Sequence, residues 1–243
     1  MYHTVVIGGG CLGAATAVSL QKKLNKLGKG EKVGLIEKAV LCAAESSRHS
    51  GIVRSANADP DASMMASIST KMWKNIRDHW GIDMELDEFG AIWIAKKNSD
   101  GDNPAWTDLS KRMEKINLVF EEIDPDSAIQ KCGTTLITDK DESYFYEPAA
   151  FQLDPSILRS TLYEAIEENG VELFEKTEVE TMVAAGNSIQ SCLTNNGKFD
   201  GKHFVNATGA WSSQLFTKLG LKIPVTIEPV SVVNWMESPK QIK

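Results

Sequence analysis

Three glycines near the start of the sequence have the spacing of a turn that holds a pyrophosphate. Gly8, Gly10 and Gly13 form the pattern GxGxxG between the apolar run HTVVI and a stretch of small residues. Glycine permits a tight turn and a close approach of the backbone to phosphate, and the N-terminus of a following helix faces the anion. Glu37 ends the next apolar run, where a carboxylate can bind ribose hydroxyls and disfavour a 2′-phosphate. A purely structural turn needs only the glycines, so the combination favours a dinucleotide site.

A second glycine turn lies far downstream, in HFVNATGAW at 203–211. A strand there runs into Thr208 and Gly209, and a pattern of short hairpins at 177–194 precedes it. A nicotinamide-type nucleotide domain does not by itself need this return. The two turns together match the two-dinucleotide-motif plan of flavoproteins, in which the chain comes back to the nucleotide domain with a second segment for the cofactor. Trp211 either packs near the nucleotide or belongs to the core.

The loop ESSRHSGIVRS at 45–55 carries a family resemblance. The sequence resembles the DAO-type superfamily of FAD-dependent D-amino-acid oxidases, glycine oxidases and sarcosine oxidases, whose matching loop passes the pyrophosphate and reaches the flavin. IVRS is similar to the sarcosine oxidase β-subunit, whereas HSGIV also resembles L-2-hydroxyglutarate dehydrogenase and malate:quinone oxidoreductase. Residues 153–182 resemble the family's Asp-Pro helix and the strand whose valine, here Val179, contacts adenine through its backbone.

The resemblance implies an FAD-dependent oxidoreductase that oxidises a small amine or amino acid. In this chemistry a hydride passes from the carbon next to nitrogen to the flavin, and the imine product hydrolyses. Two alternatives stay open: a 2-hydroxy-acid dehydrogenase of the L-2-hydroxyglutarate or malate type with a quinone acceptor, and a noncatalytic FAD-binding fragment or subunit. The residues implied to bind FAD are Gly8, Gly10, Gly13, Glu37, Ser46, Ser47, Arg48, His49, Val179, Thr208, Gly209 and Trp211. The implied catalytic residues are His49 and Arg54.

Both implied catalytic residues have more than one interpretation. His49 bonds covalently to the flavin, as in the dimethylglycine dehydrogenase relatives, or contacts it noncovalently, or is a solvated loop side chain. Its motif is spaced differently from theirs, which favours the noncovalent contact. Arg54 either binds a substrate carboxylate through two parallel hydrogen bonds or forms an ion pair within the protein.

Hydrophobic periodicity predicts the elements that must position these residues. The pattern of elements predicts an α/β fold with interleaved segments. The resemblance implies a flavin-type Rossmann domain with FAD-binding segments 1–80 and 149–219, interleaved with a mostly β, incomplete substrate domain at 81–148 and 220–243. Predicted strands are 3–7 and 32–38, with a strand pair at 84–97 and hairpins after 177. Predicted helices are 11–27, 63–80, 105–117 and 153–170. The second has apolar residues at helical spacing, namely Met65, Ile68, Met72, Trp73, Ile76 and Trp80, and Trp73 and Trp80 are expected to lie in the core.

Composition limits the other possibilities. The net charge of −7 and the absence of a lysine or arginine block argue against nucleic acid as a partner. The four cysteines form no CxxC pair, so neither a metal site nor a disulfide framework is predicted. No signal peptide or membrane-spanning run is visible, which favours the cytoplasm.

The end of the sequence also differs from the resembling family. Those enzymes continue with another glycine-rich segment that covers the flavin, and none follows IPVTIEPV at 223–230. We therefore expect a chain that lacks the family's C-terminal part, or one whose active site a partner subunit completes. The substrate is expected to be a small amine, amino acid or hydroxy acid.

Overall fold

The computed structural model describes residues 1–57, 59–98, 104–132, 136–217 and 219–229, and they form two units. The first unit comprises Met1–His49, Ile76–Met84 and the described residues from Pro155 onward. The second comprises Ser50–Asn75 and Glu85–Asp154. The assignment of FAD-binding and substrate roles to the expected domains stays a prediction.

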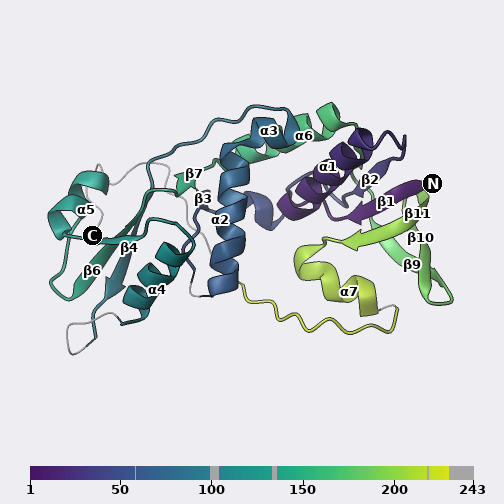
Figure 1. The fold of residues 1–243 in the computed structure, drawn as a ribbon. Coiled ribbons are helices and arrows are strands. Elements are labelled where there is room, and N and C mark those ends of the chain that lie inside the picture. Colours follow the sequence, from purple (N-terminus) through teal and green to yellow (C-terminus); the bar gives the residue numbers. More distant parts are fainter. Residues whose placement is uncertain (58, 99–103, 133–135, 218, 230–243) are drawn as a thin grey trace. The chain divides into compact units, whose positions relative to one another are not determined.

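A six-stranded sheet forms the centre of the first unit, in the order β8-β2-β1-β11-β10-β9 (Figure 1). The four strands β8, β2, β1 and β11 run parallel, and β11, β10 and β9 form an antiparallel meander. The hairpins expected after 177 are therefore confirmed. The strands of this sheet are β1 (Tyr2–Ile7), β2 (Val33–Ile36), β8 (Glu172–Phe174), β9 (Val179–Ala185), β10 (Ser188–Thr194) and β11 (Gly197–Asn206). Its helices are α1 (Cys11–Lys26), η1 (Glu45–Ser47), α3 (Ile76–Trp80), α6 (Pro155–Asn169), η2 (Gly209–Trp211) and α7 (Ser212–Thr217).

The central strands are apolar because both faces of the sheet are covered. Val5 and Ile7 pack with Leu215 of α7 on one face. Val6, which points to the other face, is also fully buried. Helices α1 and α6 pack against each other, and the small residues Ala14 and Ala17 of α1 are buried. This packing fixes the start of α1 at the end of β1.

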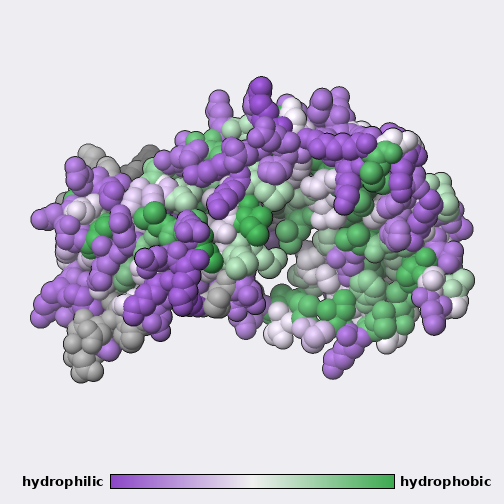
Figure 2. All heavy atoms as spheres, in the orientation of Figure 1, coloured by the Kyte–Doolittle hydropathy of each residue, from purple (hydrophilic) through white to green (hydrophobic). Residues whose placement is uncertain are grey.

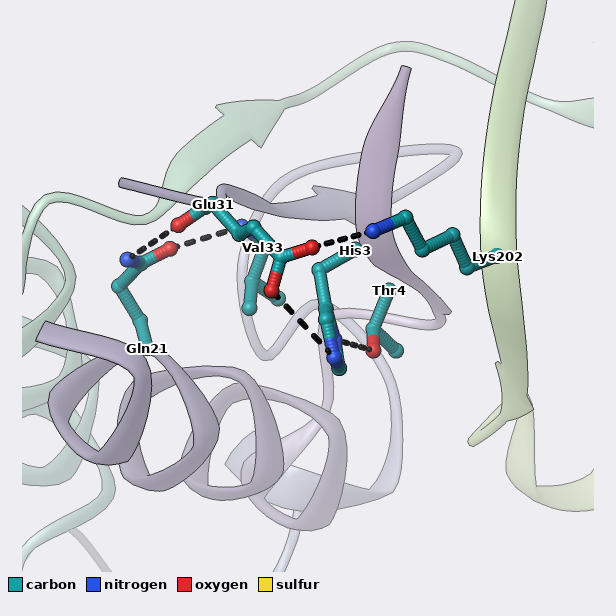
Figure 3. Close-up of polar contacts among 6 residues, drawn as sticks. All are labelled: His3, Thr4, Gln21, Glu31, Val33 and Lys202. Atoms are coloured by element: carbon teal, nitrogen blue, oxygen red, sulfur yellow. Dashed lines mark hydrogen bonds and ion pairs between the residues drawn. The ribbon is translucent and has the colours of Figure 1, made fainter. Parts of the chain in front are cut away.

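A polar network connects α1 to the strands β2, β1 and β11 (Figure 3). The buried amide of Gln21 accepts a hydrogen bond from the backbone N–H of Val33 at 2.7 Å and donates to the carbonyl of Glu31 at 3.1 Å. The Glu31 carboxylate forms ion pairs with Lys202 of β11 and with His3 of β1. Gln21 thus supplies an acceptor to the buried backbone N–H of Val33, the first residue of β2.

The second unit is built on a three-stranded antiparallel sheet in the order β4-β6-β5. Its core is aromatic: Trp106 stacks on Phe145 at 5.6 Å, and Phe120 stacks on Phe145 at 5.4 Å, measured between ring centroids. The strands are β3 (Ile52–Val53), β4 (Ala91–Lys96), β5 (Glu121–Ile123), β6 (Glu142–Glu147) and β7 (Phe151–Gln152). The helices are α2 (Pro60–Lys74), α4 (Pro104–Lys115) and α5 (Pro125–Cys132).

The helix expected at 63–80 differs from the prediction in two ways. It divides at Asn75 into α2 and α3, and only α3 buries its apolar residues, Ile76 and Trp80. On α2 the buried residues are Ser63, Ser67 and Thr70, while the outward apolar residues Met64, Met65, Ile68 and Met72 are exposed, and Trp73 is half-buried. The Ser63 hydroxyl accepts from the Asn57 N–H at 3.1 Å, and Thr70 lies 3.1 Å from the Ser55 hydroxyl. These hydroxyl contacts outweigh the apolar periodicity.

The strand pair expected at 84–97 is also wrong in its pairing. β4 pairs with β6, a strand about fifty positions later, and the register aligns Ala91 with Glu147. Before Gly90 only Asp87 bridges, and its partner is Gln152. Gly90 keeps a positive φ of 78°, so the turn is present although no hairpin follows from it.

Surface properties add two findings. Figure 2 shows hydrophobic side chains gathered over α7 and the segment that follows it, where Leu221, Val225 and Ile227 are exposed. In the part of the chain that the structure describes, no helix combines the length and apolarity needed to cross a bilayer.

Candidate functional site

The glycine turn is so tightly packed that side chains are excluded from it. A Cβ atom on Gly8, whose φ is +108°, would lie 2.4 Å from the carbonyl oxygen of Ala207. A Cβ on Gly13 would lie 1.9 Å from the carbonyl oxygen of Gly8. Glycine is therefore required at both positions, at the first by backbone conformation and at the second by contact. The glycine turn and the start of α1 consequently lie against the Ala-Thr-Gly turn at 207–209, after β11, which is called the ATG turn below.

The N-terminus of α1 is open to an anion. The N-cap residue, Gly10, has no side chain to cap the helix, and the first turn carries no acidic residue. The first-turn N–H of Cys11 donates to the hydroxyl of Ser46 at 2.9 Å. This bond brings the loop at 45–55, called the serine-rich loop below, to the N-terminus of α1. A helix end of this kind carries a partial positive charge and backbone donors suited to a phosphate group.

Glu37 lies across the turn from this helix end. One carboxylate oxygen accepts from the Gly9 N–H at 2.7 Å, and the other accepts from the Ala39 N–H at 2.8 Å. The next residue, Lys38, lies with its ammonium 3.8 Å from the ring centroid of Trp211. Trp211 is 38% exposed, which argues against a purely structural core role.

A cavity of about 380 Å³ opens between these segments, entirely within the first unit. Eight of the residues expected to bind FAD line it: Gly8, Gly10, Glu37, Ser46, Val179, Thr208, Gly209 and Trp211. The cavity wall is mostly apolar, with polar groups at the helix end and at Glu37. An apolar cavity with a few converging polar groups is the usual form of a cofactor site. The open helix end and the crowded glycines fit the pyrophosphate of FAD.

Several residues that line the cavity were not anticipated from the sequence. They are Cys11, Leu12, Lys38, Thr177, Glu178, Gln214 and Leu215, among others. Lys38 follows Glu37 directly and so shares its position at the end of β2, a signal that was available in the sequence. Burial raises the pKa of the Cys11 thiol to about 11, so this side chain is a thiol rather than a thiolate at neutral pH.

The next residues of the serine-rich loop, Ser47, Arg48 and His49, are not among the residues that line the cavity. Ser47 donates from its hydroxyl to the Ala44 carbonyl at 3.2 Å. The ring Nε2 of His49 donates to the carbonyl of Ser46 at 3.1 Å, and the side chain is half-buried. Arg48 is exposed. Contact of these residues with FAD stays a prediction.

Arg54 belongs to the second unit, where two contacts hold it. Its guanidinium carbon lies 4.4 Å from the ring centroid of Trp93, and Nη1 donates to the carbonyl of Ala56 at 2.5 Å. Within the described part of the chain it forms no ion pair with a carboxylate. The interpretation of Arg54 as an internal ion-pair partner therefore has no support among these residues.

Known proteins resemble this chain over nearly its whole length. The model of the protein family described as FAD dependent oxidoreductase, DAO, matches residues 3–242. Glycine oxidase of Geobacillus kaustophilus is 24% identical over 237 residues, which cover 92% of this chain and 59% of that protein. The mouse pyruvate dehydrogenase phosphatase regulatory subunit is 22% identical over 213 residues, which cover 88% of this chain and 23% of that protein. The crystal structure of L-proline dehydrogenase from P. horikoshii has a TM-score of 0.79 at 23% identity, covers 94% of this chain and 58% of its own, and shows the same fold. The chain thus spans less than two thirds of each of these proteins.

Proposed function

The chain belongs to the family of FAD dependent oxidoreductases, and on this premise we propose that it binds FAD in the cavity at the glycine turn and serves the oxidation of a small amine or amino acid. When bound, FAD accepts the hydride from the carbon next to nitrogen. Every other task in the reaction falls to the protein: to bind, to orient and to exclude water.

One observation carries the proposal: two turns from opposite ends of the chain converge on one cavity. The first-turn amides of α1 would hold the pyrophosphate, with Ser46 beside them. Glu37 would exchange its bond to the Gly9 N–H for the ribose hydroxyls, and Val179 would meet the adenine through its backbone. The turn at Thr208 and Gly209 would close the other side of the cofactor.

Arg54 is proposed to bind the substrate carboxylate. Its exposed guanidinium is held in place by Trp93 and has no carboxylate partner among the described residues, which supports this role. His49 is proposed to contact the flavin without a covalent bond. Because the chain spans 59% of the glycine oxidase it matches, we propose that substrate turnover also requires a further segment or a partner subunit.

Titration with FAD tests the cofactor site. The purified chain should quench FAD fluorescence, and Glu37→Gln should weaken the affinity about tenfold because one ribose acceptor becomes a donor. Glu164→Gln, an exposed change on α6, is the matched control and should bind as the wild type does. Absence of any FAD uptake by the wild type would refute the proposed cavity.

Acid precipitation of the loaded protein tests the bond at His49. Flavin colour should remain in the supernatant, whereas colour in the pellet would support a histidyl-flavin bond. When the further segment or partner subunit is supplied, anaerobic bleaching should then occur with sarcosine, proline or a D-amino acid. Bleaching by malate or 2-hydroxyglutarate alone would instead favour the hydroxy-acid alternative.

A noncatalytic role is the second candidate, and one similarity favours it. The mouse relative is named a regulatory subunit, and this chain matches it over 88% of its own length. This candidate predicts FAD binding with no bleaching by any substrate, even when a longer chain or partner is supplied.

A further inference from the structure

A fully buried carboxylate lies at the end of β6 in the second unit. Glu147 is 0% exposed, and no arginine, lysine or histidine of the described residues forms an ion pair with it. A buried carboxylate is unfavourable unless hydrogen-bond donors replace its water. Three donors do so: the backbone N–H groups of Ser55 and Ala56, at 2.5 and 3.2 Å from Oε1, and the indole N–H of Trp93, at 3.1 Å from Oε2.

Two of the residues that donate to Glu147, Ala56 and Trp93, also hold Arg54 through other groups. The carbonyl of Ala56 accepts from Arg54 Nη1 at 2.5 Å, and the face of Trp93 lies under the guanidinium at 4.4 Å. Glu147 therefore fixes both supports of the arginine without touching it. Donation of the indole N–H to a carboxylate also increases electron density on the ring, which strengthens its attraction for the cation.

These contacts suit an arginine that must be ready before its ligand arrives. An exposed arginine side chain ordinarily samples many rotamers, and the loss of that freedom reduces its affinity for a carboxylate. A guanidinium already stacked on an indole and bonded to a carbonyl loses less freedom on binding. Its planar fork can still meet a carboxylate through two hydrogen bonds.

We propose that Glu147 is a positioning residue that holds Arg54, through Trp93 and the Ser55–Ala56 backbone, in the conformation that receives the carboxylate of an amino-acid substrate. The substrate role of Arg54 rests on the proposed function. The positioning by Glu147 does not depend on it and can be measured separately.

Side-chain NMR of arginine-labelled protein separates these two statements. The chain has five arginines, and loss of one Nε–H signal in Arg54→Lys assigns that of Arg54. Its ¹⁵N heteronuclear NOE reports the rigidity of the side chain, and titration with acetate reports carboxylate binding. In Glu147→Gln an amide NH₂ must face either the backbone donors or the indole N–H. The NOE should therefore fall by at least half, and the acetate Kd should rise at least fivefold. Glu121→Gln, an exposed change on β5 of the same sheet, should alter neither value.

Trp93→Phe keeps an aromatic face under Arg54 and removes only the indole donor to Glu147. It should reduce the NOE less than Glu147→Gln does, and it replaces that variant in the test if Glu147→Gln does not fold. An unchanged NOE and an acetate Kd within twofold of the wild type, in whichever variant folds, would overturn the proposal. A reduced NOE in a protein whose Arg54 signal never responds to acetate would support the positioning by Glu147 and refute the substrate role of Arg54.

Discussion

Gly13→Ala is the most informative single change in the first unit, because it adds one methyl group where the structure has no room. The new Cβ would lie 1.9 Å from the carbonyl oxygen of Gly8 and 3.2 Å from the Cβ of Ala207. Both contacts are backbone or short side chain, so neither neighbour can turn away. The start of α1 must therefore move outward from the end of β1.

The size of the effect follows from that distance. An unstrained contact needs roughly 3.3 Å, so the helix start must shift by about 1.4 Å. Overpacking of this kind costs about 1–3 kcal/mol, and alanine in place of glycine within a helix returns about 0.5–1 kcal/mol. We expect a net loss in the free energy of unfolding of about 1–2 kcal/mol. The displaced helix end should also weaken FAD binding at least about tenfold, since a helix terminus contributes up to about 2 kcal/mol to a bound anion.

Urea unfolding followed by tryptophan fluorescence measures the first quantity, and FAD fluorescence quenching measures the second. Gly10→Ala is the matched control, because its Cβ would meet only the hydroxyl of Ser46, at 3.2 Å, and that side chain can rotate. The control should lose less stability than Gly13→Ala. If Gly13→Ala unfolds at the wild-type urea concentration and binds FAD equally well, then close packing at Gly13 does not set the position of α1.

Two further substitutions and two solution experiments test other parts of the structure. Gln21→Leu leaves the buried N–H of Val33 without the Gln21 acceptor and should cost about 1–3 kcal/mol in urea unfolding. The loss should exceed that of Glu31→Gln, which weakens the partly exposed ion pairs with Lys202 and His3; equal effects would contradict the assigned role of the amide. Asp59→Ala removes the side chain that accepts from the Ala62 N–H at 2.8 Å and should cost about 1 kcal/mol, with the loss of α2 helicity visible by circular dichroism. Burial raises the pKa of the Cys42 and Cys192 thiols to about 11, so iodoacetamide should alkylate the exposed Cys132 first at pH 8 by mass spectrometry. Because the folded state holds these protons more tightly, stability should fall as the pH rises from about 9 toward 11.

Local patterns predicted the first unit well because its site is encoded by short-range signals. The strand, glycine turn and helix of β1 and α1 are contiguous, and Glu37 follows from the end of the next strand. The Pro155–Asn169 helix and its closing Gly170, at φ +75°, follow from start and stop signals in the same way. The ATG turn needed only the recognition that a strand ended there.

The second unit was less predictable because its determining contacts are distant in sequence. Nothing near β4 indicates that its partner is β6, and nothing near Glu147 indicates that it binds Ser55, ninety-two positions away. The periodicity of 63–80 indicated an apolar inner face, but the hydroxyls of Ser63 and Thr70 meet the loop at 55–57 instead. A residue-level pattern cannot report an acceptor that folding brings from elsewhere.

Helix α2 buries hydroxyl side chains and exposes methionines, which affects how the protein responds to oxidants. Its anchoring contacts are made by hydroxyls, while its thioethers, those of Met64, Met65 and Met72, are exposed. Peroxide converts such methionines to sulfoxides, which turns an apolar helix face into a polar one. Because none of these side chains is among the buried hydrophobic residues, oxidation would change the chemistry of the surface while the fold keeps its stability. The methionine sulfoxide content of α2 would then report how much oxidation the protein has undergone, while its free energy of unfolding stays that of the unoxidised protein.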